Sequence, residues 1–143
     1  VSGATEGMIA GIPSIAFSIA QFGKVDYSYS KKFARYLAEQ VLTRGLPSGT
    51  LLNVNIPNLP ENKIEGILVT RQGKARFEEY FDRRLDPANR VYYWLAGKKM
   101  ALDTADDIDD VVITKRKVSV TPLHFDLTNH SFLEELRNWK LQK

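Results

Sequence analysis

The first twenty residues constrain the fold of this chain more than any other stretch. Residues 2–10 place glycine and alanine along one side, which predicts a short helix whose backbone lies close against a sheet. Gly11 follows where that helix would end, because glycine adopts the left-handed conformation without steric cost. After Pro13, the apolar run 14–19 is typical of a strand buried on both faces of a parallel sheet. Such a strand needs neighbours, and no strand precedes it in this sequence.

Length and composition predict one domain with its own core, since the chain has 143 residues. No apolar run reaches the roughly 18–20 residues of a membrane helix, so we expect no membrane contact. The chain has no cysteine, which fits a reducing compartment, and we expect a cytoplasmic location. The net charge of +3 is mild and the cations at 98, 99 and 115–117 are scattered, which argues against nucleic-acid binding.

The next predicted helices and strands are typical of an α/β domain whose first strands are not part of this sequence. Residues 29–44 repeat apolar side chains at helical spacing, with Asp26 or Ser28 as the candidate cap. Residues 50–56 predict a strand that ends at a proline-rich turn, and residues 64–71 predict another. The order helix, strand, helix, strand, strand is typical of the α/β class.

Residues 76–84 and 91–95 predict a long β-hairpin, because two β-rich runs flank a loop with Asp-Pro and Asn. Aromatic side chains occur on both of its faces. A hairpin of this kind cannot bury itself, so we expect it to project and to pack on another chain or on a distant part of this one. The alternative is a meander on the main sheet. Residues 97–103 are predicted to be a connector.

The last third of the chain begins with an acidic cluster, since residues 104–110 include four aspartates. Their spacing does not match an EF-hand calcium loop. We favour carboxylates at the start of a short helix, where the helix dipole stabilises them, over a calcium site. Residues 118–121 predict a strand that ends at Pro122, and Thr128 or Asn129 would cap a last helix.

Two small constellations carry weak chemical signals. His124 and Asp126 would share one face of a strand, with His130 nearby, but a solvated pair beside a helix cap is favoured over a metal site. Residues 70–76 place three cations around a glycine turn, which makes this loop a weak anion-binding candidate. The alternative for this loop is the solvated base of a hairpin.

The start of the first helix is a further candidate for anion binding. A helix N-terminus offers free backbone N–H groups and the positive end of a dipole. Ser2 and Gly3 would lie in the first turn. The signal is weak by itself, because every α/β fold has several such helix ends.

Five collinear stretches resemble motifs of the SurE family, the stationary-phase survival nucleotidases. The first is V-S-G-A-T-E-G-M-I-A-G-I-P-S-I-A-F-S, similar to the family segment that follows a Ser-Gly-Thr loop. The others are residues 52–57, 86–87 with 90–97, 109 with 118–123, and 126–128. The resemblance spans nearly the whole chain.

The resemblance implies an enzymatic activity, and it implies that the residues that bind the metal are not in this sequence. SurE proteins are metal-dependent phosphatases of nucleoside monophosphates, which implies a divalent ion, Mg or Mn, in the intact enzyme. The family's metal ligands are an Asp-Asp pair, a serine and an asparagine, and all precede the segment that Val1 begins. We therefore expect this chain to be the C-terminal half of such a protein, with no metal ligand and no catalytic residue. It would be inactive alone and would need the N-terminal half as its partner.

The family also implies a Rossmann-like fold with a projecting hairpin and a C-terminal helix. Residues 1–75 would be the remainder of the α/β nucleotidase layer, 76–97 a hairpin for oligomer contacts, and 98–143 a C-terminal segment of helix, strand and helix. Exchange of the hairpin and C-terminal segment between subunits implies a homodimer or homotetramer. Ser2 and Gly3 would face a nucleoside monophosphate as substrate-binding residues. The alternative is an oligomerisation or binding module without catalytic activity.

Overall fold

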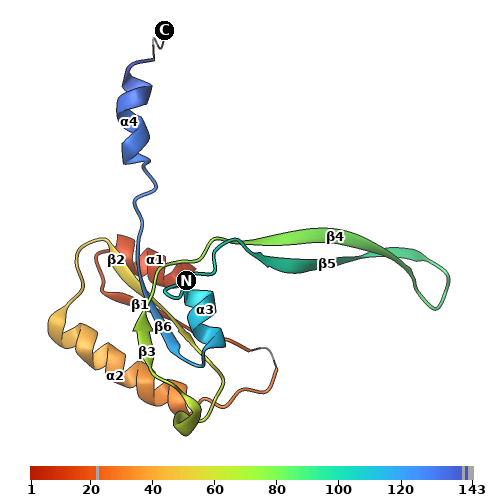
Figure 1. Cartoon of the computed structure of the whole chain (residues 1–143), viewed down its shortest axis with the longest axis horizontal. Helices are drawn as coiled ribbons and strands as arrows, with labels where there is room; N and C mark the ends of the chain where they lie inside the picture. The colour runs from red at the N-terminus through yellow and green to blue at the C-terminus, as the bar shows by residue number, and fades with distance from the viewer. Residues whose placement is uncertain (22, 140, 142–143) are drawn as a thin grey trace.

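The computed structural model describes residues 1–21, 23–139 and 141, and it consists of a four-stranded sheet with helices on both faces and a long hairpin that extends away from it (Figure 1). The helices are α1 (Ser2–Ile9), α2 (Ser28–Arg44), the 3-10 helix η1 (Glu61–Lys63), α3 (Asp109–Thr114) and α4 (His130–Arg137). The strands are β1 (Ser14–Ile19), β2 (Thr50–Ile56), β3 (Ile67–Val69), β4 (Ala75–Leu85), β5 (Val91–Ala101) and β6 (Val118–His124). The predicted α/β class is confirmed.

Strand β2 lies inside the sheet, whose order is β1-β2-β6-β3. It runs parallel to β1, with Ser14 beside Leu51 and Ile19 beside Ile56. On its other side it runs antiparallel to β6, and β6 in turn pairs in parallel with β3. The sheet is therefore mixed, with β1 and β3 as its edges.

Helix α2 covers one face of this sheet. Its Phe33 packs in a buried cluster with Val54 and Ile56 of β2 and with Val118 and Val120 of β6. Side chains two residues apart on a strand share a face, so each strand contributes a pair to the cluster. The predicted helix is confirmed because its apolar stripe matches this apolar sheet face.

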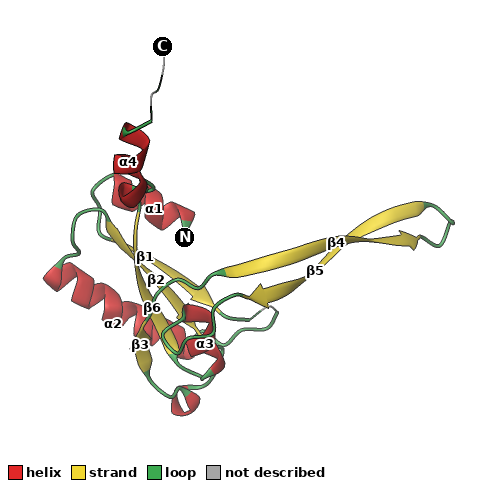
Figure 2. Ribbon diagram, turned by 45° about the horizontal axis from the view of Figure 1, so that its top comes forward, coloured by secondary structure: helices red, strands yellow, loops and turns green. Residues whose placement is uncertain are grey.

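Helices α1 and α3 cover the opposite face (Figures 1 and 2). Helix α1 lies so close to β1 that a Cβ on Gly7 would run into the hydroxyl of Ser14. This contact explains the glycine at position 7, because a bulkier residue there would displace Ser14 or the helix. Met8 of α1 and Leu51 of β2 are buried in the same layer.

Three buried hydroxyl groups lie where the end of β3 meets β6. The Oγ1 of Thr70 is 2.8 Å from the Oγ of Ser119 and 2.6 Å from the Oγ1 of Thr121. All three residues are at most 6% exposed. A buried hydroxyl without a partner would destabilise the fold, and here the three groups satisfy one another.

Strands β4 and β5 form a separate two-stranded sheet rather than a meander on the main sheet. The turn between them is held by Asp86, whose carboxylate accepts from the N–H groups of Ala88 and Arg90 at 2.8 and 2.9 Å. The predicted connector over residues 97–103 is wrong, since β5 continues to Ala101.

Gly97 explains that error, because a glycine inside a strand argues locally against a strand. Here the ring of Phe77 on the neighbouring strand lies directly against it, leaving no room for a Cβ. An aromatic ring that covers a strand glycine compensates for the missing side chain.

Strand β6 runs on through Pro122 to His124, so its predicted end at Pro122 is wrong. The N–H of Val118 donates to Gly66 and the carbonyl of Val120 accepts from Thr70, so alternate residues of β6 point toward β3. By this alternation the missing N–H of Pro122 also points toward the β3 side, beyond the end of β3. Proline therefore removes no ladder hydrogen bond with β2.

Strands β3 and β1 also differ from expectation. The strand predicted over residues 64–71 is reduced to Ile67–Val69, because Gly66 turns the chain with a φ of 128°. The prediction that residues 14–19 are buried on both faces is wrong for this chain, since Phe17 is 41% exposed. The reason is topological, because β1 is an edge strand here.

The α2-facing core predicts the effect of truncating a single side chain. Ile56→Ala removes a residue that is 2% exposed, and it should lower the free energy of unfolding by about 2–5 kcal/mol. The matched control is Val69→Ala on β3, which is 72% exposed and should change stability by no more than ~0.5 kcal/mol. Urea titrations followed by circular dichroism measure both. Equal losses in the two variants would contradict the assigned core.

Candidate functional site

The carboxyl ends of the parallel strands β1 and β2 form the sheet edge at which α/β folds usually bind ligands. Asn58 ties together the segments that follow these two strands. Its Nδ2 donates to Oε1 of Gln21 at 2.8 Å, and its Oδ1 accepts from the N–H of Asp26 at 3.0 Å. Sequence reasoning missed this role, although an asparagine in a proline-rich turn is a recognisable backbone-bonding residue.

Asp26 stabilises the first turn of α2, close to the carboxyl ends of β1 and β2. Its Oδ1 accepts from the N–H of Ser28 at 2.9 Å and from the Ser28 hydroxyl at 2.6 Å. The two hydrogen bonds stabilise the carboxylate and lower the pKa of Asp26. The predicted cap is wrong for both candidates, because the N-cap of α2 is Tyr27 and no side chain caps it, although the Asp26 carboxylate binds the N–H of Ser28 in the first turn.

Ser2 and Gly3 lie exposed in the first turn of α1, where the sequence placed them. The N–H of Thr5 donates to the carbonyl of Val1 at 3.0 Å, and this is the first hydrogen bond of the helix. The N–H groups of Ser2 and Gly3 precede it, so helix geometry gives them no partner within α1. Two backbone donors are thus presented at the positive end of the helix dipole.

The direction of α1 aims these donors toward the carboxyl edge. Gly7 packs on Ser14 at the beginning of β1, and the helix runs antiparallel to that strand. From Gly7 back to Ser2 the helix advances about 7.5 Å, whereas β1 advances about 13 Å from Ser14 to Ser18. The N-terminus of α1 therefore lies over the middle of β1, with its N–H groups directed toward the carboxyl end of the strand.

The acidic segment (residues 103–110) uses its carboxylates within the chain rather than as a calcium site. Its partners are Arg71 for Asp103 and Asp107, Lys115 for Asp106, the N–H of Gly73 for Asp109, and Lys99 for Asp110. Asp109 and Asp110 lie in the first turn of α3, as the helix-start interpretation predicted. Arg71 lowers the pKa of Asp103 by hydrogen bonding, and Lys115 lowers that of Asp106.

The predicted anion-binding loop at residues 70–76 has its main donors engaged by that segment. The guanidinium of Arg71 binds Asp103 at 2.7 Å and Asp107 at 2.9 Å. The N–H of Gly73 donates to Oδ1 of Asp109 at 3.0 Å. The loop thus serves as the base of the hairpin, which was the alternative interpretation.

His124, Asp126 and His130 come together beside the start of α4. The Nε2 of His130 is 2.5 Å from Oδ2 of Asp126, and the N–H of Asp126 donates to Nδ1 of His124 at 3.2 Å. The hydrogen bond with His130 lowers the pKa of Asp126. Asn129 caps α4 by accepting from the N–H of Phe132 at 3.1 Å. The arrangement is an exposed hydrogen-bonded pair beside a helix cap.

The described part of the chain does not fit a metal centre. Within it, no group of three or more His, Cys, Asp or Glu side chains is arranged to hold a metal ion. Nor does any described helix have the length and apolar character needed to cross a membrane.

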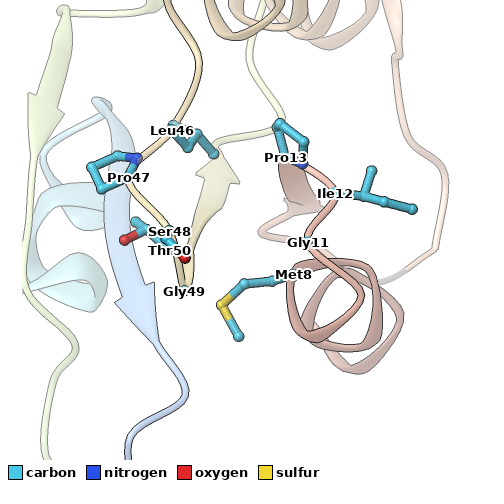
Figure 3. A pocket seen from close by; sticks show the side chains of 9 residues that line it. All are labelled: Met8, Gly11, Ile12, Pro13, Leu46, Pro47, Ser48, Gly49 and Thr50. Carbon is cyan, nitrogen blue, oxygen red and sulfur yellow. The ribbon is translucent and has the colours of Figure 1, made fainter.

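A cavity of about 240 Å³ lies at the amino-terminal edge of the sheet, between the turn after α1 and the loop before β2 (Figure 3). Its nine lining residues, which include Met8, Ile12 and Leu46, carry no ionisable side chain. It also lies at the opposite end of β1 from the carboxyl edge. We therefore assign no chemistry to it.

The hairpin presents two chemically different faces, which the register of its strands decides. One, the apolar hairpin face, aligns six side chains that are 46–72% exposed: Phe77, Phe81, Leu85, Val91, Tyr93 and Leu95. The sequence predicted that neither face is cleanly apolar, and the register confirms it, because Glu79, Arg83 and Lys99 lie on this same face between or beside the apolar side chains. Exposed apolar patches of this kind mark interaction surfaces.

The opposite, charged hairpin face is largely self-satisfied. The guanidinium of Arg84 lies 5.5 Å from the ring centre of Trp94, and its Nε is 2.7 Å from Oδ2 of Asp82. Glu78 stands directly opposite Lys98. Cation–π and opposite-charge pairs stabilise this face without a partner. The apolar hairpin face is thus the one suited to a contact.

The chain is similar to known proteins in both sequence and fold. The family model described as Survival protein SurE matches residues 1–79. A 5'-nucleotidase SurE from Chlorobium phaeobacteroides is 50% identical over 143 residues, which is 100% of this chain and 55% of that relative. A 5'-nucleotidase SurE from Moorella thermoacetica is 50% identical over 136 residues, 95% of this chain and 52% of that relative.

A solved structure gives the same result for the fold. The SurE protein from Aquifex aeolicus matches with a TM-score of 0.79 at 41% identity, over 96% of this chain and 55% of that one. The chain spans about half the length of the curated relatives it matches. Its α/β sheet, its hairpin and its sequence agree in one assignment: the chain belongs to the SurE family of survival proteins.

Proposed function

We propose that this chain is the C-terminal part of a nucleotidase that hydrolyses nucleoside 5′- or 3′-monophosphates to nucleoside and phosphate. The observation that carries the proposal is 50% identity, over the whole chain, to a relative named 5'-nucleotidase SurE. The chain corresponds to 55% of that relative, which leaves room for a further half. The similarity of residues 1–18 to the family segment after the Ser-Gly-Thr loop supports the proposal that this further half is N-terminal.

The N-terminal half would hold the divalent ion, Mg or Mn, that the resemblance implies. The described residues of this chain offer no metal centre, so they would not hold that ion. A cytoplasmic location goes with the proposal, because a chain without cysteine fits a reducing compartment.

This chain would contribute to phosphate binding through the start of α1. The N–H groups of Ser2 and Gly3 are the donors that a phosphate oxygen could accept from, and the helix dipole favours the negative charge there. Asn58 supports the same edge by fixing the segments after β1 and β2. The role is to bind and orient the substrate, and none of these groups would be a catalytic residue.

The free edge of β1 is the surface on which the N-terminal half would join. The N–H of Ala20 donates to the carbonyl of Ile56 at 2.9 Å, so by alternation the N–H groups of Ile15, Phe17 and Ile19 point away from β2. An unpaired strand edge is a template for another strand. A strand connected through α1 to β1 would pair there in parallel, by the right-handed crossover rule.

The first test is enzymatic. The purified 143-residue chain, incubated with a nucleoside monophosphate and Mn²⁺ or Mg²⁺, should release no phosphate above a metal-only blank, because its described residues offer no metal centre. Phosphate release is measured colorimetrically over several hours. Turnover above the blank would contradict the proposal that the N-terminal half supplies the metal ligands and that this chain is inactive alone.

A second proposed function is assembly, and the apolar hairpin face favours it. A homodimer or homotetramer would bury this face and the C-terminal segment, where Phe132 and Trp139 stack edge to face with ring centres 5.8 Å apart. Helix α4 extends away from the sheet, as the hairpin does (Figure 1). If the chain proves to be an independent module, this assembly would be its whole function.

The two hairpin faces provide a matched test of assembly. Phe81 and Leu95 are cross-strand neighbours on the apolar face, and replacing both with serine should weaken association. Each lost apolar side chain costs about 1.5–3 kcal/mol, which raises Kd by roughly ten- to a hundredfold. Tyr80→Ser on the charged face is the control and should leave the oligomer intact.

Sedimentation equilibrium measures the mass of each variant. The parent chain should sediment as a dimer or tetramer, and the double variant should shift toward the monomer. A monomeric parent, or a control that dissociates as readily as the double variant, would refute assembly through this face.

A further inference from the structure

We propose that the acidic segment (residues 103–110) is a clamp that fixes the direction in which the hairpin leaves the sheet. The hairpin is a separate sheet that extends away from the main one (Figures 1 and 2), so its direction depends on the contacts at its base. The proposal concerns conformation alone, and it holds or fails independently of the nucleotidase assignment.

The strand that enters the hairpin is held at Arg71 by backbone and side chain together. The N–H of Arg71 donates to the carbonyl of Asp107 at 3.0 Å, and the N–H of Asp109 donates to the carbonyl of Arg71 at 3.2 Å. Its guanidinium meanwhile binds Asp103 and Asp107 through separate nitrogens. A planar guanidinium bound at two points is held in orientation as well as position.

Gly73, the next contact along this strand, brings the backbone against the clamp. Its N–H donates to Oδ1 of Asp109 at 3.0 Å. A Cβ at this position would lie 2.7 Å from the Cγ2 of Ile108, so only glycine fits without displacement. The entering strand is therefore in direct contact with the acidic segment and not merely paired with it by charge.

The strand that leaves the hairpin is held from the other side. The Nζ of Lys99 on β5 is 2.5 Å from Oδ2 of Asp110. The N–H of Leu102 donates to the carbonyl of Lys74 at 3.1 Å, which keeps the two strands together at their base. Asp103, just beyond, returns to Arg71 and closes the ring of contacts. Both strands are thus attached to one segment.

The clamp itself is anchored in the core. Ile108 is 1% exposed and Val112 of α3 is fully buried. Helix α3 packs on β6 and β2, so the acidic segment cannot shift without disturbing the sheet. A single exposed ion pair contributes little, but here several share one buried anchor and the backbone bonds between them. We infer that the apolar hairpin face is held at a set angle.

Distance measurements between two spin labels test the clamp. The chain has no cysteine, so labels on Ala88→Cys at the hairpin turn and Leu42→Cys on α2 occupy defined sites. An excess of unlabelled chain suppresses distances between molecules. The parent should give one narrow distance distribution. Arg71→Met removes the two-point contact and should broaden that distribution and move its maximum.

The control is Lys32→Met, which removes a single ion pair of 2.7 Å with Glu61 away from the hairpin base. It should leave the distribution unchanged. Asp107→Asn and Lys99→Met each remove one contact of the clamp and are measured in the same way, with circular dichroism to select the folded variants. Distributions that match the parent in every folded clamp variant would overturn the proposal, as would broadening of equal size in the control.

Discussion

The antiparallel pairing of β2 with β6 is the interaction on which the rest of the structure depends. It joins residues 50–55 to residues 119–124, so β3, the hairpin and α3 all lie between its two strands in the sequence. Within it Val54 pairs with Val120, and both contribute to the α2-facing core. The other edge pairings, of β1 and β3, rest on these two strands. Without this pairing the hairpin and its clamp would have no fixed base.

Each functional surface lies at the margin of this framework. The donors of α1 lie over the middle of β1 and point toward its carboxyl end, β1 is an edge strand among the described residues, and the hairpin carries its apolar face away from the sheet. Strand edges and exposed apolar faces are normally covered in a protein that works alone. Both proposed functions use these surfaces, one at the edge of β1 and the other at the apolar hairpin face.

Local sequence patterns predicted most helices and strands. Contacts between distant residues determined where some of the strands end, and these ends could not be predicted from the sequence. Helix α2 and strand β2 follow from apolar periodicity that needs no partner to be recognised. Strand β5 continues past Gly97 because the ring of Phe77 on β4 covers this glycine. Strand β6 continues past Pro122 because β3 ends before it could pair with the missing N–H of Pro122.

The candidate sites follow the same division. The position of Ser2 and Gly3 at a helix start was readable from local pattern. The ion pairs of Arg71 join residues 32 and 36 positions apart, so no local spacing could have indicated them. The cross-strand pairing of Phe81 with Leu95 and of Leu85 with Val91 emerged only from the register of the two strands, which local sequence does not specify.

The central claim is that the free edge of β1 is the joint with the N-terminal half of a SurE nucleotidase. Amide hydrogen exchange at Ile15, Phe17 and Ile19, recorded for the chain alone and after addition of the N-terminal half, tests it most directly. We expect rapid exchange of these amides in the chain alone and strong protection in the mixture, because a new strand would accept hydrogen bonds from these N–H groups. Exchange at these three amides that does not change on mixing would contradict it.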